Sequence, residues 1–346
     1  MPAHKIVGLL LVMMLSVAAQ SPAPSPPAQP EDGPGGSAYP HAEVMTTRIG
    51  SGAGEVHLFE PASPTPSRAP VVVFTHGWAA MDPNFYGAWI RHIVRRGNTV
   101  IYPRYQADAR TPVREFDVNA LAATRLALDV LRTPGHVAPD ERGLVFVGHS
   151  MGGLVAANLA VYAARGALPR PLALMSVAPG KTWPAPSPIA FHLADLSALP
   201  PELLLLAVVG DDDDFVRDVD ARKIYRGATA VPDANKDFVR LYSDHHGTPA
   251  LIADHRMATA PDRLVETDEE TRPPRRLPRG REPGSRGPRV TDALDYYGTW
   301  KLLDGLVDAV FRGVHREYAL GGTREQRFMG RWSDGMPARE LMIEEP

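Results

Sequence analysis

Short runs of β-branched and other apolar residues alternate along the chain with longer stretches in which apolar positions recur every three to four residues. The short runs predict strands and the longer pattern predicts helices. The expected strands cover residues 44–48, 55–59, 71–74, 99–102, 144–147, 172–177, 203–209 and 238–242. Strands that alternate with helices form a mostly parallel central sheet with helices on its faces, so the predicted fold class is α/β.

The pattern also indicates how the two ends of this sheet are organised. Residues 44–48 and 55–59 are close enough in sequence to form an opening antiparallel pair. One apolar stripe predicts a helix that begins near Arg114, and a second stripe predicts a helix over 303–310. The late helix is expected to pack back onto the sheet.

Residues 1–20 have a different pattern. Lys5 precedes an apolar run over residues 6–19 that is broken only by Ser16, and the run ends in small residues. A positive start, a short apolar middle and a small-residue end are typical of a secretory signal peptide. The run is shorter than the roughly 20 residues of a membrane-spanning helix. We therefore predict a secreted or periplasmic protein with no membrane span after signal cleavage, an uncleaved anchor being the alternative.

The remaining boundaries follow from composition. Residues 21–40 alternate proline with small residues and predict a mobile linker. Residues 41–320 are expected to form the folded domain, and 321–346 an irregular C-terminal tail. Within the domain, residues 265–290 form a Pro/Arg-rich insertion, whose composition favours a solvated segment over a basic flap or docking surface.

Charge and cysteine content exclude several classes of function. The 346 residues include 37 Lys and Arg against 40 Asp and Glu, so no net charge attracts the chain to nucleic acid. The chain has no cysteine, which excludes disulfides, thiolate metal sites and a cysteine nucleophile. The sequence does not determine the oligomeric state.

The most informative motif is Gly148-His149-Ser150-Met151-Gly152-Gly153, which lies between a predicted strand and a helical pattern. A G-x-S-x-G sequence in this position makes a sharp turn that presents the serine hydroxyl at the carboxyl edge of the sheet. Small Gly148 and Gly152 let the neighbouring backbone pass close by. Ser150 is the candidate nucleophile, and it needs a base to take its proton.

This motif, together with Phe74-Thr75-His76-Gly77-Trp78 after an earlier strand, resembles the α/β-hydrolase family. The resemblance spans roughly residues 44–311. More specifically, the two motifs look like those of the branch that contains chlorophyllases and cutinase-like polyester hydrolases. It implies an α/β-hydrolase fold over 41–320, with an oxyanion hole formed by the backbone N–H groups of Trp78 and Met151. Attack on a carbonyl places negative charge on oxygen, which such fixed donors stabilise.

The acid of a catalytic triad is expected just after a later strand, where Asp211, Asp212, Asp213 and Asp214 are consecutive. The family pattern of glycine, then aspartate three residues on, then valine three after that, implies Asp213. Asp212 and Asp214 remain alternatives. The spacing of a calcium-binding loop is absent.

The base is expected after the next strand, where His245 and His246 are adjacent. We predict His246, because Gly247 follows it as glycine often follows the histidine in the family, and His245 is the alternative base. The order Ser150, Asp213, His246 matches the family's order of nucleophile, acid and base. His255 is expected to be structural.

These residues predict a secreted serine hydrolase that cleaves a small or polymeric carboxylic ester through an acyl-enzyme intermediate, with no metal and no cofactor. Trp183, in a Pro-rich stretch over 178–188, is a candidate for lining an acyl pocket. An acyltransferase using the same triad is one alternative function. A non-catalytic binding protein with a hydrolase-like fold is the other.

Overall fold

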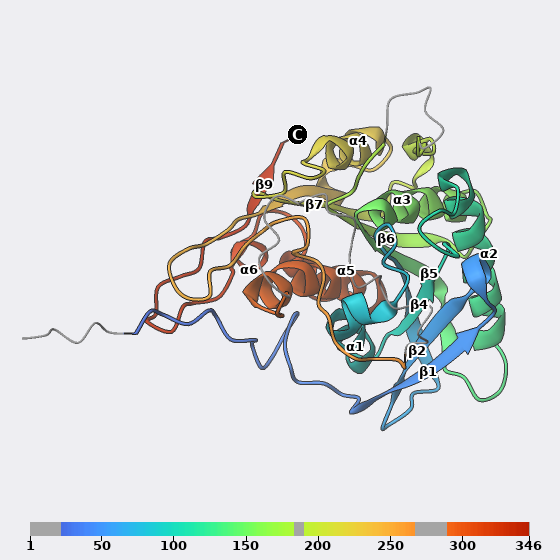
Figure 1. Ribbon diagram of the computed structural model, residues 1–346, viewed down its shortest axis with the longest axis horizontal. Coiled ribbons are helices and arrows are strands. Elements are labelled where there is room, and N and C mark those ends of the chain that lie inside the picture. The colour runs from blue at the N-terminus through green and yellow to red at the C-terminus, as the bar shows by residue number, and fades with distance from the viewer. Residues whose placement is uncertain (1–21, 183–189, 267–288, 346) are drawn as a thin grey trace, which may run out of the picture.

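The computed structural model describes residues 22–182, 190–266 and 289–345. In these residues one nine-stranded sheet has the strand order β1-β2-β4-β3-β5-β6-β7-β8-β9 (Figure 1). The strands are β1 (Glu43–Ile49), β2 (Val56–Ala62), β3 (Arg68–Thr75), β4 (Thr99–Pro103), β5 (Ala138–His149), β6 (Pro171–Val177), β7 (Leu204–Gly210), β8 (Lys236–Leu241) and β9 (Met342–Glu344). Neighbours from β4 to β8 are parallel, whereas β1, β2 and β9 pair antiparallel. The predicted, mostly parallel sheet is confirmed.

Helices cover both faces of this sheet (Figure 1). They are α1 (Gly87–Arg95), α2 (Phe116–Leu131), α3 (Met151–Ala164), α4 (Val219–Gly227), α5 (Lys301–Arg312) and the short α6 (Arg324–Arg327), with a π-helical turn over Leu294–Trp300 leading into α5. Successive side chains of a strand point to opposite faces. Accordingly, Val71 and Val73 of β3 pack in the core beneath α2, α3 and α4, whereas Val72 and Phe74 pack beneath α1 and α5. The central strands are therefore buried on both faces, which explains their continuous apolar runs.

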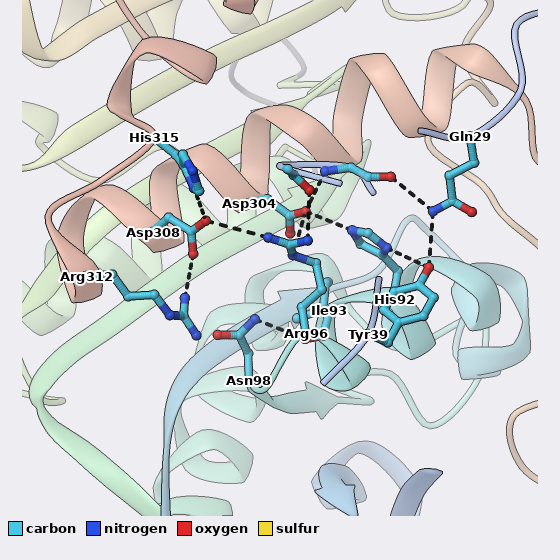
Figure 2. Close-up of polar contacts among 12 residues, drawn as sticks. Gln29, Tyr39, His92, Ile93, Arg96, Asn98, Asp304, Asp308, Arg312 and His315 are labelled. Atoms are coloured by element: carbon cyan, nitrogen blue, oxygen red, sulfur yellow. Dashed lines mark hydrogen bonds and ion pairs between the residues drawn. The ribbon is translucent and has the colours of Figure 1, made fainter. Parts of the chain in front are cut away.

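Residues 22–40 pack against the folded domain, although they form no helix or strand. Gly35 N donates to Asp304 Oδ2 of α5 at 2.7 Å, and Tyr39 Oη lies 3.0 Å from His92 Nδ1 of α1. Gln29 bridges these two points by donating to Gly35 O and Tyr39 Oη (Figure 2). The expectation of a mobile linker is therefore wrong for residues 22–40, which form a strap over α1 and α5.

The C-terminal tail is also more ordered than the sequence indicated. β9 adds the last strand to the sheet beside β8, and α6 lies beside α5 (Figure 1). The buried Lys301 ammonium of α5 donates to three backbone carbonyls in the tail, those of Glu325, Gln326 and Phe328. The prediction of an irregular tail over 321–346 is wrong for these elements, because its contacts are made with residues far away in sequence.

Several sequence-based predictions lie outside the described residues: the signal peptide over 1–20, Trp183, and most of the 265–290 insertion. Within the described ranges, no helix is both long enough and apolar enough to cross a lipid bilayer.

Candidate active site

Ser150 lies in the sharp turn between β5 and α3, with φ 57° and ψ −126°. This backbone conformation is rare for a residue with a side chain and is typical of functional turns. The turn also requires glycine on both sides. A Cβ on Gly148 would lie 2.2 Å from Gly152 O, and one on Gly152 would lie 2.1 Å from Thr75 O. The sequence motif thus forms the predicted turn at the carboxyl edge of the sheet, at the N-terminus of α3.

His255 is the histidine that contacts Ser150. Its Nε2 lies 2.9 Å from Ser150 Oγ, and its Nδ1 lies 2.9 Å from Asp213 Oδ2. A neutral imidazole with its proton on Nδ1 donates to the Asp213 carboxylate and accepts from the Ser150 hydroxyl. This hydrogen-bond chain has the geometry of a nucleophile, a base and an orienting acid.

The structure does not bring His246 to Ser150, so the prediction of that contact is wrong. His246 Nε2 lies 2.7 Å from Asp334 Oδ2, and its ring packs against Trp332 of the tail. The alternative, His245, is exposed. Beyond β8, paired backbone hydrogen bonds between Asp244 and Leu251 fold the chain back on itself. Only after this turn does the chain reach the site, so His255 takes the place expected for His246.

A local feature of the sequence does distinguish His255. It follows Leu251 and Ala253, which are buried and anchor the loop beneath the site. His245 and His246, in contrast, follow the polar residues Ser243 and Asp244. A histidine that must keep a fixed orientation needs an anchored loop, and buried apolar residues just before it are a local sign of one.

Among the four aspartates after β7, Asp213 is the one brought to the histidine. Its side chain is fully enclosed, and its Oδ1 accepts hydrogen bonds of 3.0 Å from the amides of Phe215 and Val216. Burial opposes ionisation, but the hydrogen bond and charge of His255 and these two amides outweigh it, so the pKa of Asp213 is below its ordinary value. Asp212 and Asp214 are exposed.

The loop after β3 lies directly beside Ser150. A Cβ on Gly77 would lie 3.4 Å from Ser150 Cβ, so this loop and the turn are in close approach. The loop is held by Ala79 N, which donates to Gln106 Oε1 at 3.0 Å, and by Tyr102 Oη, which donates to Ala80 O at 2.6 Å. Within the described residues, the amides of Trp78 and Met151 have no hydrogen-bond partner.

Comparison with known proteins gives a family match over part of the chain. The Chlorophyllase family model matches residues 45–183, a range that includes Ser150 and the loop after β3. The chain has the α/β-hydrolase fold and is similar to the chlorophyllases over this range. Carboxyl esterase 2 from the mycorrhizal fungus Tuber melanosporum is a structural neighbour, with a TM-score of 0.49, 17% identity, and coverage of 64% of this chain and 81% of that chain. No curated protein gave a significant sequence match.

Two partly exposed aromatic residues lie on the loops that meet at Ser150. Trp78, on the loop after β3, is 39% exposed, and Phe215, after Asp213, is 49% exposed. The Phe215 ring centroid lies 4.9 Å from that of His255. In contrast, Tyr86 and Trp89 are buried in the core. Among the described residues, no cluster of three or more histidine, aspartate and glutamate side chains could hold a metal ion.

Proposed function

We propose that this α/β-hydrolase is a serine esterase that cleaves a carboxylic ester through an acyl-enzyme intermediate. The observation that carries the proposal is the continuous contact from Ser150 Oγ through the His255 imidazole to the Asp213 carboxylate. A serine hydroxyl is a weak nucleophile until a positioned base removes its proton, and His255 is placed to do so. The match to the Chlorophyllase family supports ester chemistry.

The proposed reaction has two half-reactions. Ser150 Oγ attacks the ester carbonyl while its proton moves to His255 Nε2, and the Asp213 carboxylate stabilises the resulting imidazolium. His255 then gives this proton to the leaving alcohol, which departs and leaves an acyl-serine. Water attacks the acyl-serine with the same base, and the carboxylic acid is released.

The negative oxygen that forms in each half-reaction needs fixed donors. We assign this role to the amides of Trp78 and Met151, which have no other partner in the described chain. Met151 is also the first residue of α3, where the helix dipole favours negative charge. The exposed faces of Trp78 and Phe215 suit an ester with an apolar group beside the scissile bond.

The test combines fluorophosphonate labelling with the hydrolysis of p-nitrophenyl esters of short and long acyl chains. Ser150→Ala is expected to abolish labelling, and Ser150→Ala and His255→Ala are each expected to lower kcat by roughly 10⁴- to 10⁶-fold. His246→Ala and His245→Ala serve as controls. They are expected to keep kcat within about threefold of the original, because neither histidine touches the site.

Two results would overturn this proposal. One is full activity in His255→Ala together with loss in His246→Ala, which would transfer the role of base to His246. The other is an ester of glycerol, in place of free acid, as the main product when glycerol is added, which would identify an acyltransferase.

Export is part of the proposal and rests on the sequence of residues 1–20. N-terminal sequencing of the protein released by an expressing cell would test it. We expect the released chain to begin close to residue 21, and retention of residues 1–20 in a cell-bound form would contradict export.

A further inference from the structure

His149, the residue before the nucleophile, has no part in the proposed reaction, yet it lies at the centre of the site. Its side chain is buried between the loop after β3 and the loop that carries His255. The His149 ring centroid lies 4.9 Å from that of His255 and 5.8 Å from that of Tyr86. His149 therefore contacts both of the loops that must be aligned with Ser150.

The hydrogen bonds of His149 fix the position of its proton. Nε2 lies 2.7 Å from the backbone carbonyl oxygen of His255, and Nδ1 lies 2.9 Å from Tyr86 Oη. A carbonyl only accepts, so Nε2 carries the proton and Nδ1 accepts from the Tyr86 hydroxyl. Burial, the larger cause, and the neighbouring His255, the smaller one, lower the pKa of His149 to about 3. The imidazole is therefore neutral at physiological pH.

The Tyr86 hydroxyl extends this chain to the loop after β3. While it donates to His149, its oxygen accepts from Gly77 N at 2.9 Å. Gly77 precedes Trp78, the proposed oxyanion donor, and is close to Ser150. One unbranched series of hydrogen bonds thus runs from Gly77 through Tyr86 and His149 to the backbone of His255.

From this geometry we propose that Tyr86 and His149 are positioning residues that align the oxyanion loop and the base with Ser150. The role rests on the proposed function, since it concerns the same site. Asp213 holds the ring of His255 from one side, while His149 holds its backbone from another. Because His149 is adjacent to Ser150 in the chain, its hydrogen bond fixes the position of the loop that carries His255 relative to Ser150.

Three variants separate positioning from simple packing. His149→Leu fills the space but removes both hydrogen bonds, whereas His149→Gln retains an amide N–H that can donate to the His255 carbonyl. Tyr86→Phe removes only the hydroxyl. Tyr162→Phe is the matched control, because it removes a tyrosine hydroxyl bonded to Asp117 on α2, outside the site.

We expect His149→Leu and Tyr86→Phe to lower kcat for a p-nitrophenyl ester by about 10- to 100-fold with little change in KM, because misaligned reacting groups slow the chemical step. The rate of Ser150 labelling by a fluorophosphonate should fall in parallel. His149→Gln should recover a substantial part of kcat, and Tyr162→Phe should leave kcat unchanged. Hydrogen exchange of the amides around residues 253–258 should speed up in His149→Leu and not in Tyr162→Phe.

Folded His149→Leu and Tyr86→Phe proteins with the original kcat and labelling rate would overturn the proposal. So would a His149→Gln protein no more active than His149→Leu. If His149→Leu fails to fold, Tyr86→Phe decides by the same measurements. An unmodified protein that neither labels nor turns over would instead overturn the proposed function, and the exchange data would then decide whether His149 holds the base loop.

Discussion

Of the four consecutive aspartates that follow β7, Asp213 is set apart by the donors that surround it. Two backbone amides bind its Oδ1 and His255 binds its Oδ2. Asp211, in contrast, accepts from the amide and hydroxyl of Ser243, and so fixes the start of the loop that follows β8. Adjacent residues of one type thus have separate tasks, which the protein environment assigns.

Replacement of Asp213 by asparagine tests whether Asp213 is the acid that orients His255. In Asp213→Asn the Nδ1–H of His255 loses its charged acceptor, and the ring is free to adopt the other tautomer. We expect kcat to fall by about 10⁴-fold with little change in KM. Asp214→Asn is the matched control and should keep its kcat, because that side chain is exposed. Equal losses in both variants, measured with one p-nitrophenyl ester, would argue against Asp213 as the orienting acid.

The sequence located these residues to different degrees. Ser150 directly follows β5, and Asp213 lies in the short loop just after β7, so the strand pattern was enough to place them at the same edge of the sheet. His255 lies well beyond the end of β8, after a turn closed by Asp244 and Leu251. That turn depends on Trp332 Nε1 and Arg339 N, which donate to Asp244 from the tail. No local pattern encodes contacts over such a separation.

At the scale of elements, strand patterns predicted β1 to β8. The buried strands carry continuous apolar runs, whereas β1, at the edge of the sheet, has no buried residue and was predicted from its β-branched residues and its proximity in sequence to β2. β9 was missed for an equally physical reason. It has three residues, lies at the edge of the sheet and pairs with β8 through its backbone. Arg240 of β8 also binds Glu344, and Arg222 of α4 lies 3.3 Å from the same carboxylate. A strand of three residues is too short to show an alternating pattern that distinguishes it from a loop.

Helices α2 and α3 are joined by a partly buried carboxylate. Asp117 Oδ2 accepts from Asn158 Nδ2 at 2.7 Å and from Tyr162 Oη at 3.1 Å. Asn158 also binds the backbone at His192 and Ala194, so this contact anchors the chain that leads to the strand β7. Burial outweighs these hydrogen bonds and raises the pKa of Asp117 to about 6.

This raised pKa predicts a dependence of stability on pH. An unfolded aspartate has a pKa of about 3.9, so between about pH 4 and pH 6 the folded state holds a proton that the unfolded state has lost. The contribution of Asp117 to stability therefore falls as the pH rises through this window, by about 2 to 3 kcal/mol. Asp117→Asn removes the titration.

The measurement is the difference in Tm between the unmodified protein and Asp117→Asn from pH 4 to pH 7. We expect the unmodified protein to lose roughly 4–8 °C relative to the variant across this range. Other titrating groups are shared by both proteins and cancel in the difference. A difference that stays constant with pH would show that folding does not shift the pKa of Asp117.

At the scale of the whole molecule, the strap over 22–40 was the least predictable part, because proline-rich composition describes what a segment can do alone and not what it packs against. Arg96, which follows the last residue of α1, binds both the strap and α5: it donates to Gly33 O at 2.9 Å and to Asp304 Oδ2 at 3.0 Å (Figure 2). Its partly buried charge is thereby paired and hydrogen-bonded. The strap thus supplies hydrogen-bond partners to polar side chains that lie between α1 and α5.

Two glycines of the strap provide a test of whether it is docked in solution. Gly33 and Gly35 have nearly the same left-handed backbone, with φ of 78° and 81°. A Cβ on Gly33 would meet no atom within 4 Å, whereas one on Gly35 would lie 1.9 Å from Tyr296 O. Gly33→Ala should therefore cost only the left-handed conformation, about 1 kcal/mol. Gly35→Ala should also displace the strap and remove one donor from the buried Asp304, for a total of about 2 to 4 kcal/mol.

Thermal unfolding and limited proteolysis of the two variants distinguish a docked strap from a loose one. We expect Gly35→Ala to have the lower Tm and to be cleaved within 22–40 by proteinase K before the folded domain is attacked, while Gly33→Ala resists cleavage as the unmodified protein does. In a loose segment neither alanine would meet a neighbour, so the two variants would unfold and be cleaved alike. Because Pro24 O also accepts from Thr248 N in the loop after β8, displacement of the strap should further loosen the chain that leads to His255. Gly35→Ala is thus expected to lower esterase kcat as well as stability, and Gly33→Ala is not.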